Sequence, residues 1–237
     1  MRCNCIPLFA TMQEKVKLTI NDQPVTGRPG MTILEAAREH GIDIPTLCYI
    51  EGLPPIGACR LCVVEVEGSR TLVGSCHTPI VEGMVVQTHS PKVIAARRVL
   101  VELMLASHPD SCLVCDKANI CELRKIAADL EVGLPRFHAR KHYYPTEFEN
   151  PYLIRDMSKC VQCRRCVVGC RNAKGEPMFS VAYRGFESKM VTGLDRPVDD
   201  IICEACDECI TLCPSGALRK PRQPGKFKAE RAVFIRG

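Results

Sequence analysis

Cysteine is the residue type in this sequence that could carry out the most varied chemistry. The 237-residue chain contains 17 cysteines, six histidines and no tryptophan. Thiolates bind soft metals, form disulfides or act as nucleophiles, and their spacing decides which use is open. The odd count argues against complete disulfide pairing, and the first residues do not resemble an export signal. We therefore expect metal ligation in a reducing, cytoplasmic environment.

The last two cysteine groups share one spacing, C-x2-C-x2-C-x3-C. Bacterial ferredoxins carry two [4Fe–4S] clusters on such runs, and the fourth cysteine of each run binds the other cluster. Zinc would use pairs of C-x2-C, and these runs supply it with too many sulfurs. Arg171 stands where a proline is expected after the first run, whereas Pro214 follows the second. The two predicted ligand sets are Cys160, Cys163, Cys166 with Cys213, and Cys203, Cys206, Cys209 with Cys170.

Four earlier cysteines have the spacing C-x10-C-x2-C-x13-C. Plant-type [2Fe–2S] ferredoxins use C-x4-C-x2-C and a distant fourth cysteine, so this loop is a lengthened version. Gly57 and Ala58 are small and let backbone N–H groups approach sulfur. The alternative is four structural cysteines without a metal. We predict a [2Fe–2S] cluster on Cys48, Cys59, Cys62 and Cys76.

A third group has only three cysteines, Cys112, Cys115 and Cys121. His108 stands four residues before the first of them. A cubane needs a fourth ligand, and imidazole replaces thiolate in some iron–sulfur sites. Pro109 ends the preceding helix and holds His108 at the turn that faces the loop. An ordinary surface or core histidine is the alternative, but it would leave the cluster one ligand short, so we predict that His108 binds this [4Fe–4S] cluster.

The ligand sets together predict one [2Fe–2S] and three [4Fe–4S] clusters, with iron as the only metal. Cys3 and Cys5 could bind a metal or belong to an unstructured terminus, and we favour the terminus. We find no catalytic residues, no glycine-rich nucleotide motif and no nickel-binding cysteine pair beyond the cluster ligands. The histidines without a predicted role are His40, His77, His89, His138 and His142.

The formal net charge of +5 counts every thiol as neutral. Ligand thiolates outweigh the iron and sulfide charge of each cluster, so the loaded chain has a net charge of about −2. Much of the basic excess therefore compensates the clusters, and nucleic-acid binding is not expected. No stretch approaches the roughly 18–20 apolar residues of a membrane helix.

The segment from 13 to 90 has the pattern of a β-grasp domain. Val16, Leu18 and Ile20 alternate with polar residues, as in a half-buried strand. A capping box at Thr32-Ile33-Leu34-Glu35 opens a short helix that stops at Gly41. Further strands are expected over residues 62–67 and 84–89.

Ser90 and Pro91 are residue types favoured at a helix cap and first helical position. The helix that they open should run to about Ser107. It is apolar on most of its circumference, so we expect it to be buried between neighbours. A second helix is expected over residues 122–131.

The predicted fold class is α+β. A β-grasp [2Fe–2S] domain, a small helical His-Cys3 [4Fe–4S] domain with its connection, and a bacterial-type 2[4Fe–4S] ferredoxin domain occupy residues 13–90, 91–155 and 156–218. An N-terminal extension (1–12) precedes them and a basic tail (219–237) follows. Prolines and a glycine interrupt the tail, which cannot form a core and which we favour as lying along a partner. Its basic residues include Arg219, Lys220, Arg222, Lys226, Lys228 and Arg231.

The order of these four ligand sets resembles the N-terminal electron-transfer module of the large iron–sulfur subunit of respiratory complex I. The same module occurs in iron-only hydrogenases and NAD-dependent formate dehydrogenases, where a catalytic domain follows it. Here the sequence ends at Gly237, and a free-standing module is similar to the small diaphorase subunit of NAD-reducing nickel–iron hydrogenases. Those subunits commonly keep one complete ferredoxin quartet. Two complete quartets are more similar to the corresponding subunit of electron-bifurcating hydrogenases.

This resemblance implies a cytoplasmic, hetero-oligomeric electron-transfer subunit. Its partners would be a flavin- and NAD(H)-binding iron–sulfur subunit, the catalytic and small subunits of a hydrogenase and, with bifurcation, ferredoxin. Two alternatives stay open. The chain could serve a formate dehydrogenase or a complex I-like enzyme, or it could be a ferredoxin-type carrier without a permanent partner.

Overall fold

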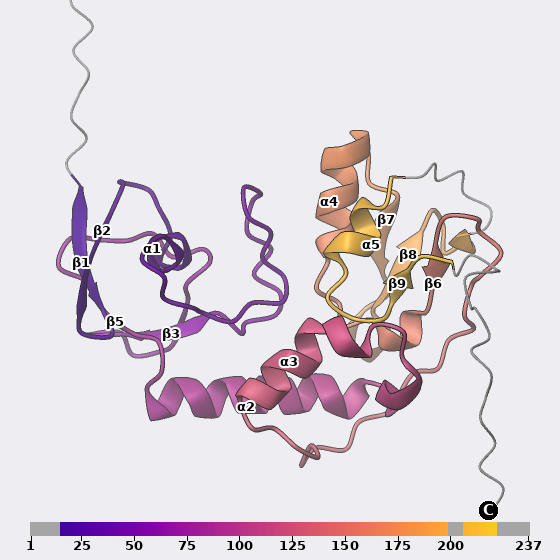
Figure 1. Cartoon of the computed structure of the whole chain (residues 1–237), viewed down its shortest axis with the longest axis horizontal. Coiled ribbons are helices and arrows are strands. Elements are labelled where there is room, and N and C mark those ends of the chain that lie inside the picture. Colours follow the sequence, from indigo (N-terminus) through magenta and orange to yellow (C-terminus); the bar gives the residue numbers. More distant parts are fainter. Residues whose placement is uncertain (1–14, 199–205, 222–237) are drawn as a thin grey trace, which may run out of the picture. The chain divides into compact units, whose positions relative to one another are not determined.

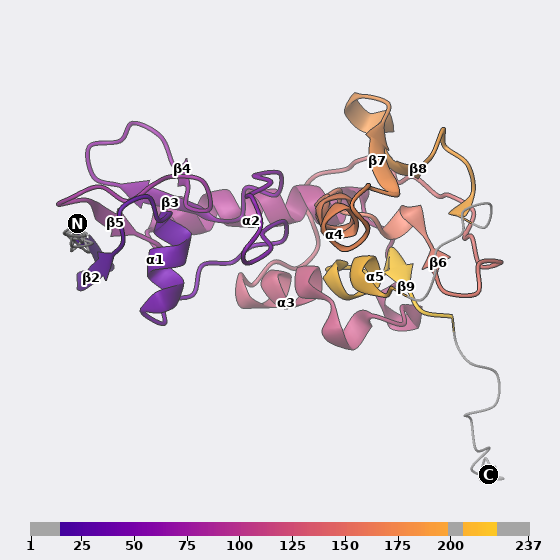
Figure 2. The same cartoon turned by 90° about the horizontal axis from the view of Figure 1, so that it is seen from above.

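A computed structural model describes residues 15–198 and 206–221 of the chain, which form two compact units (Figures 1 and 2). Among the described residues, the first unit combines residues 15–107 with the segment Glu122–Arg140. The second combines His108–Cys121 with residues 141–198 and 206–221. The segment with the predicted His-Cys3 ligands therefore shares a unit with the ferredoxin-like segment.

The first unit is built on a five-stranded sheet in the order β2-β1-β5-β3-β4. β1 and β5 are parallel, and the other neighbouring pairs are antiparallel. The predicted first strand is confirmed, since Leu18 and Ile20 are buried whereas Lys17 is exposed. The strands are β1 (Val16–Ile20), β2 (Gln23–Gly27), β3 (Val63–Val66), β4 (Val73–Gly74) and β5 (Val85–Gln87).

Helix α1 (Ile33–Glu39) packs against this sheet, as Figure 1 shows. Its predicted capping box is present. The Glu35 N–H donates to Thr32 Oγ1 at 3.3 Å, and the Thr32 N–H donates to the Glu35 carboxylate at 2.8 Å. Because this cap satisfies backbone donors at the helix start, it fixes where the helix begins. The chain then turns at Gly41, whose φ is +72°, toward the cysteine loop.

Helix α2 (Pro91–Ser107) follows the sheet and has the predicted bounds. The Val93 N–H donates to Ser90 Oγ at 3.3 Å, so Ser90 caps the helix as expected. Helix α3 (Glu122–Asp129) packs beside α2 in the same unit (Figure 1). None of the helices over the described ranges is long and apolar enough to cross a membrane.

Helix α2, expected to be buried between neighbours, is buried on one face only. One stripe is buried, with Val93, Arg97 and Val101 at intervals of four residues, whereas Leu103 is 48% exposed. β3 and α3 pack against the helix. Residues four apart lie on the same face of a helix, so the arginine shares the face of the two valines.

The second unit is organised around helices α4 (Arg165–Lys174) and α5 (Glu208–Leu212), which pack against each other (Figure 2). Both helices follow a left-handed residue, Arg164 with φ of 63° and Asp207 with φ of 55°. These residues occupy the same place in the two cysteine runs. The sequence repeat is therefore also a repeat of backbone conformation.

Short strands and turns complete the second unit. β6 pairs with β9, and β7 pairs with β8, both antiparallel. Their bounds are β6 (Ile154–Arg155), β7 (Phe179–Ala182), β8 (Lys189–Thr192) and β9 (Leu218–Arg219). The single turns of 3-10 helix are η1 (Cys112–Val114), η2 (Ala118–Ile120), η3 (Met157–Lys159) and η4 (Gly185–Glu187).

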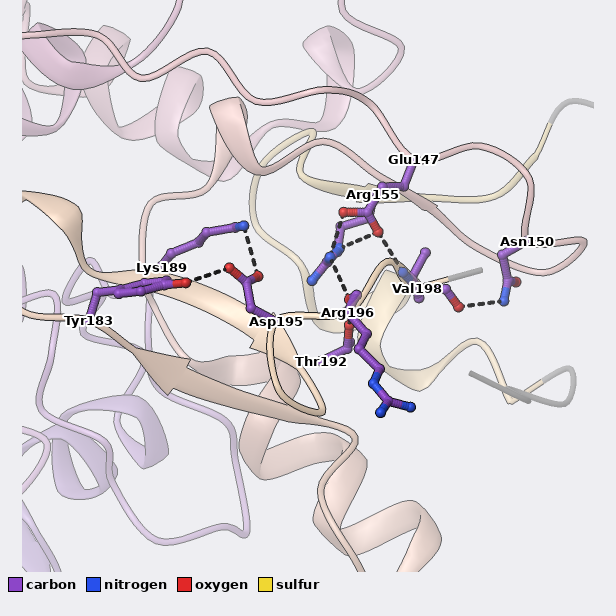
Figure 3. Close-up of polar contacts among 9 residues, drawn as sticks. All are labelled: Glu147, Asn150, Arg155, Tyr183, Lys189, Thr192, Asp195, Arg196 and Val198. Atoms are coloured by element: carbon purple, nitrogen blue, oxygen red, sulfur yellow. Dashed lines mark hydrogen bonds and ion pairs between the residues drawn. The ribbon is translucent and has the colours of Figure 1, made fainter. Parts of the chain in front are cut away.

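A polar network fixes the chain after β8 (Figure 3). Arg155 is 1% exposed, and its guanidinium pairs with the Glu147 carboxylate, with Nε to Oε2 at 2.8 Å. The same carboxylate accepts the Val198 N–H at 2.6 Å, and Arg155 Nη2 also donates to the carbonyl oxygen of Arg196 at 3.3 Å. Glu147 thus holds a buried cation and the backbone that leads from β8 to the second cysteine run.

We expect Glu147→Ala to destabilise the second unit by about 3–5 kcal/mol, because it leaves a buried guanidinium without its carboxylate. Glu149→Ala, two residues away at an exposed position, is the matched control and should change stability by no more than about 0.5 kcal/mol. Anaerobic denaturant unfolding followed by circular dichroism measures both. Equal stabilities for the two variants would contradict this assignment.

Candidate metal centres

The predicted [2Fe–2S] ligands lie together as two pairs. Cys48, Cys59, Cys62 and Cys76 are all buried. The Sγ atoms of Cys62 and Cys76 are 3.4 Å apart, and the Cys59 N–H donates to Cys48 Sγ at 3.5 Å. Four protein ligands shared by two irons give each iron two ligands, so a paired arrangement fits a [2Fe–2S] centre.

The hydrogen bond within each pair of thiols shifts their pKa values in opposite directions. The Cys59 thiol, followed by the backbone N–H groups of residues 57–59, lowers the pKa of Cys48 to about 6. The Cys76 thiol lowers the pKa of Cys62 to about 6 in the same way. The pKa values of Cys59 and Cys76 are raised, first by the thiol that each faces and then by burial. All four thiols can ionise together only when a cationic centre compensates them.

His108 has the geometry of a ligand in the second unit. Its Nδ1 lies 3.1 Å from the carbonyl oxygen of Pro109, while Nε2 is buried without a well-formed hydrogen bond among the described residues, and the backbone of Lys159 nearby acts to raise the pKa of the ring. Burial lowers the pKa of His108, which favours the neutral ring. A neutral ring that donates from Nδ1 carries a lone pair on Nε2, and metal-binding histidines have this state. The residue therefore fits its predicted role.

Two turns of 3-10 helix carry the cysteines that would join His108. Cys112 begins η1 and Cys115 follows it, whereas Cys121 follows η2. Cys112 is exposed, and the other two are half-buried. The structure thus brings short turns together, but it does not enclose these three sulfurs as it encloses the first set.

The first predicted ferredoxin set lines one cavity. Cys160, Cys163, Cys166 and Cys213 face it, together with the apolar side chains of Met157, Phe179, Met190 and Leu218. Burial raises the pKa of Cys160 to about 11 and of Cys163 to about 12, so these thiols are protonated until a metal displaces the protons. The cavity has the donor set and the apolar walls that a cluster site requires.

The second ferredoxin set is only partly described. Cys203 lies outside the described residues. Cys170 and Cys209 are buried in the core of the second unit, and Cys206 is half-buried. The Met178 N–H donates to Cys170 Sγ at 3.3 Å. No group of three or more His, Cys, Asp and Glu side chains within residues 15–198 and 206–221 is arranged to hold a single metal ion.

The His108 segment and the first ferredoxin set are in direct contact. A Cβ atom on Gly216 would lie 2.7 Å from Cys115 Sγ, so only glycine leaves room for that sulfur. Lys117 Nζ donates to the carbonyl oxygen of Ile210 at 2.8 Å, at the end of α5. It also lies 3.4 Å from the carbonyl oxygen of Cys213. Two predicted ligand loops therefore share one interface within the second unit.

Several residues beside the ligands were missed in the sequence. His77 received no role, yet its Nδ1 lies 3.5 Å from Cys76 Sγ. Gly216 and Lys117 are identified only by contacts between distant segments. Arg97 had a usable signal, because an arginine four residues from a valine on either side interrupts an apolar helical stripe. The predicted exclusion of Cys3 and Cys5 stays a prediction, since both lie outside the described residues.

Three family models match successive parts of the chain. Residues 13–91 match a 2Fe-2S iron-sulfur cluster binding domain, and residues 97–136 match the NADH-ubiquinone oxidoreductase-G iron-sulfur binding region. Residues 150–219 match the ferredoxin-like domain of NADH-quinone oxidoreductase subunit 3. Together the three matches cover most of the chain, which therefore contains these iron–sulfur domains in succession. Its mixed α/β fold holds a 2Fe–2S domain and ferredoxin-like 4Fe–4S domains, as predicted in outline.

Curated relatives share this module. The chain is 39% identical over 206 residues to the NADP-reducing hydrogenase subunit HndD of Solidesulfovibrio fructosivorans, covering 85% of this chain and 35% of the relative. It is 36% identical over 216 residues to a G-type NADH-quinone oxidoreductase subunit of Rhizobium meliloti, covering 90% and 25%. The chain thus spans about a third or less of these relatives.

A solved structure has the same fold over most of the chain. A chain of an NAD+-reducing [NiFe]-hydrogenase in the H2-reduced state superposes with a TM-score of 0.81 at 28% identity. The match covers 92% of this chain and 89% of that one. The similarity extends over nearly the whole length of both chains.

We expect Gly216→Ala to disturb the His108-containing site, because the added methyl carbon would lie 2.7 Å from Cys115 Sγ and force that sulfur to move. Iron content should fall, or the electron paramagnetic resonance spectrum of that centre should change, while the [2Fe–2S] signal stays as in the parent chain. Gly133→Ala is the matched control, since no atom lies within 4 Å of its added Cβ. Identical spectra for both variants would show that the close contact has no effect on the site.

Proposed function

We propose that the chain is an electron-transfer subunit that carries one [2Fe–2S] and three [4Fe–4S] clusters. The single observation that supports this most strongly is the contact between Cys115 and Gly216, which joins two ligand loops within one compact unit. The clusters supply one-electron transfer when bound. The chain itself would hold each cluster, shield it from water and set the charge around it.

The proposed ligand sets follow the cysteine groups of the sequence. The [2Fe–2S] cluster takes its four buried cysteines, and the His108 cluster takes the lone pair on Nε2 with three thiolates. The remaining clusters share the two ferredoxin runs. The sets are Cys48, Cys59, Cys62, Cys76; His108, Cys112, Cys115, Cys121; Cys160, Cys163, Cys166, Cys213; and Cys203, Cys206, Cys209, Cys170.

We propose that the chain is a subunit of a cytoplasmic NAD-linked hydrogenase. Similarity to a chain of an NAD+-reducing [NiFe]-hydrogenase over 92% of this sequence supports this choice, as does the similarity to an NADP-reducing hydrogenase. Electrons would pass between a flavin- and NAD(H)-binding subunit and the catalytic and small hydrogenase subunits. Two complete ferredoxin runs favour bifurcation that also involves ferredoxin.

Similarity to the G-type subunits of NADH-quinone oxidoreductase supports a second candidate, in which the same module serves a complex I-like enzyme. Anaerobic affinity purification of the full chain from its own host, with mass spectrometry of the copurified proteins, separates the two. A flavoprotein with nickel-containing subunits supports the hydrogenase. Quinone-reductase, molybdenum or membrane subunits contradict it, and an iron-loaded chain that copurifies with no partner contradicts both multisubunit assignments.

We expect His108→Cys to make its cluster harder to reduce, because a thiolate adds a negative charge where imidazole is neutral. An anaerobic redox titration should show the equilibrium constant for reduction of this centre falling at least tenfold. His138→Cys, at an exposed position, controls for the added thiol. If the titration curve of the His108→Cys centre overlays that of the parent chain, the histidine does not tune this centre.

A further inference from the structure

Arg97 is a buried cation at the predicted [2Fe–2S] loop. It lies on the inward stripe of α2 and is 1% exposed. Its Nε donates to the carbonyl oxygen of Leu61 at 2.9 Å, and its Nη2 donates to that of Val63 at 2.8 Å. These carbonyl groups belong to the residues on either side of Cys62. The guanidinium therefore clamps the backbone of one ligand from both sides.

The positive charge of Arg97 has no close carboxylate in the described part of the chain, where no salt bridge includes it. The exposed Asp43 acts on it from a distance, as does the Cys62 thiol. Burial lowers the pKa of Arg97 to about 10, so the side chain is still cationic at neutral pH. Buried charges are normally paired, and two carbonyl dipoles compensate a full charge only in part.

We propose that Arg97 positions Cys62 and is the internal counter-charge of the [2Fe–2S] centre. This inference rests on the proposed cluster at Cys48, Cys59, Cys62 and Cys76. Four thiolates give that centre a net negative charge, which grows by one on reduction. A buried cation stabilises the more negative state more strongly, so Arg97 raises the affinity of the centre for an electron. Arg98, the next residue, forms no part of this clamp.

Arg98 supplies the matched control on the same helix. Its Nε donates to the carbonyl oxygen of Leu130 at 2.8 Å, and its Nη2 pairs with Glu131 at 3.2 Å with the side chain 44% exposed. Removing the charge of Arg98 therefore changes an exposed pair and leaves the cysteine loop intact. Solvent screens this charge, whereas the charge of Arg97 acts through the protein interior.

The test is an anaerobic redox titration of the full chain, with the [2Fe–2S] signal followed by electron paramagnetic resonance. Arg97→Gln should lower the equilibrium constant for one-electron reduction about tenfold, which is about 59 mV. This is the order that Coulomb's law gives for charges within about 10 Å at an effective dielectric constant near 20. Arg97→Lys, which keeps the charge, should stay within threefold of the parent chain, and Arg98→Gln within twofold.

The outcomes separate this inference from the proposed function. A parent chain without a [2Fe–2S] signal overturns the cluster assignment itself. A fully loaded Arg97→Gln variant with the parent potential, or an Arg97→Lys variant shifted as far as Arg97→Gln, overturns the counter-charge. If Arg97→Gln loses its cluster, the Arg97→Lys variant decides between a role of the charge and a role of the hydrogen bonds. An Arg97→Lys variant that binds its cluster supports the counter-charge. An Arg97→Lys variant that also lacks the cluster overturns it and leaves only the hydrogen bonds of the guanidinium.

Discussion

Buried cysteine thiols that lie close together cannot all lose their protons without a large free-energy cost, and the predicted ligand sites of both units are subject to this constraint. Among the first four cysteines, each pair lowers the pKa of one thiol and raises that of the other. In the second unit, burial is the main cause that raises the pKa of Cys160 and Cys163. Neither site reaches its fully ionised state without compensating positive charge. Metal binding is therefore linked to deprotonation and to folding.

The fold compensates the charge of ionised cysteines with hydrogen-bond donors and cations. Backbone N–H groups point at Cys48 and Cys170, at 3.5 Å and 3.3 Å. Arg97 brings a buried charge to the backbone around Cys62, and Lys117 spans two ligand loops. The two loops meet closely because Gly216 has no side chain. The N–H groups and Arg97 compensate charge at single cysteines, whereas Lys117 and Gly216 join two ligand loops within the second unit.

Local features of the fold were predictable because they depend on residues near one another in sequence. The capping box of α1 and the start of α2 at Pro91 depend on residues only a few positions apart. Contacts between distant segments were not predictable. The close approach of Gly216 to Cys115 involves residues about one hundred positions apart. The apolar circumference of α2 did not reveal which face of the helix is buried. The cysteine groups were found from sequence, yet their assignment to particular clusters is still a proposal.

The central claim is that all four ligand sets hold iron–sulfur clusters at once. The most direct test is to measure iron, acid-labile sulfide and zinc in the anaerobically purified full chain, with Mössbauer spectroscopy to separate the cluster types. One [2Fe–2S] and three [4Fe–4S] clusters require about 14 irons and as many sulfides per chain, with essentially no zinc. Stoichiometric zinc, or a fully loaded chain with about 10 irons or fewer, would contradict the account.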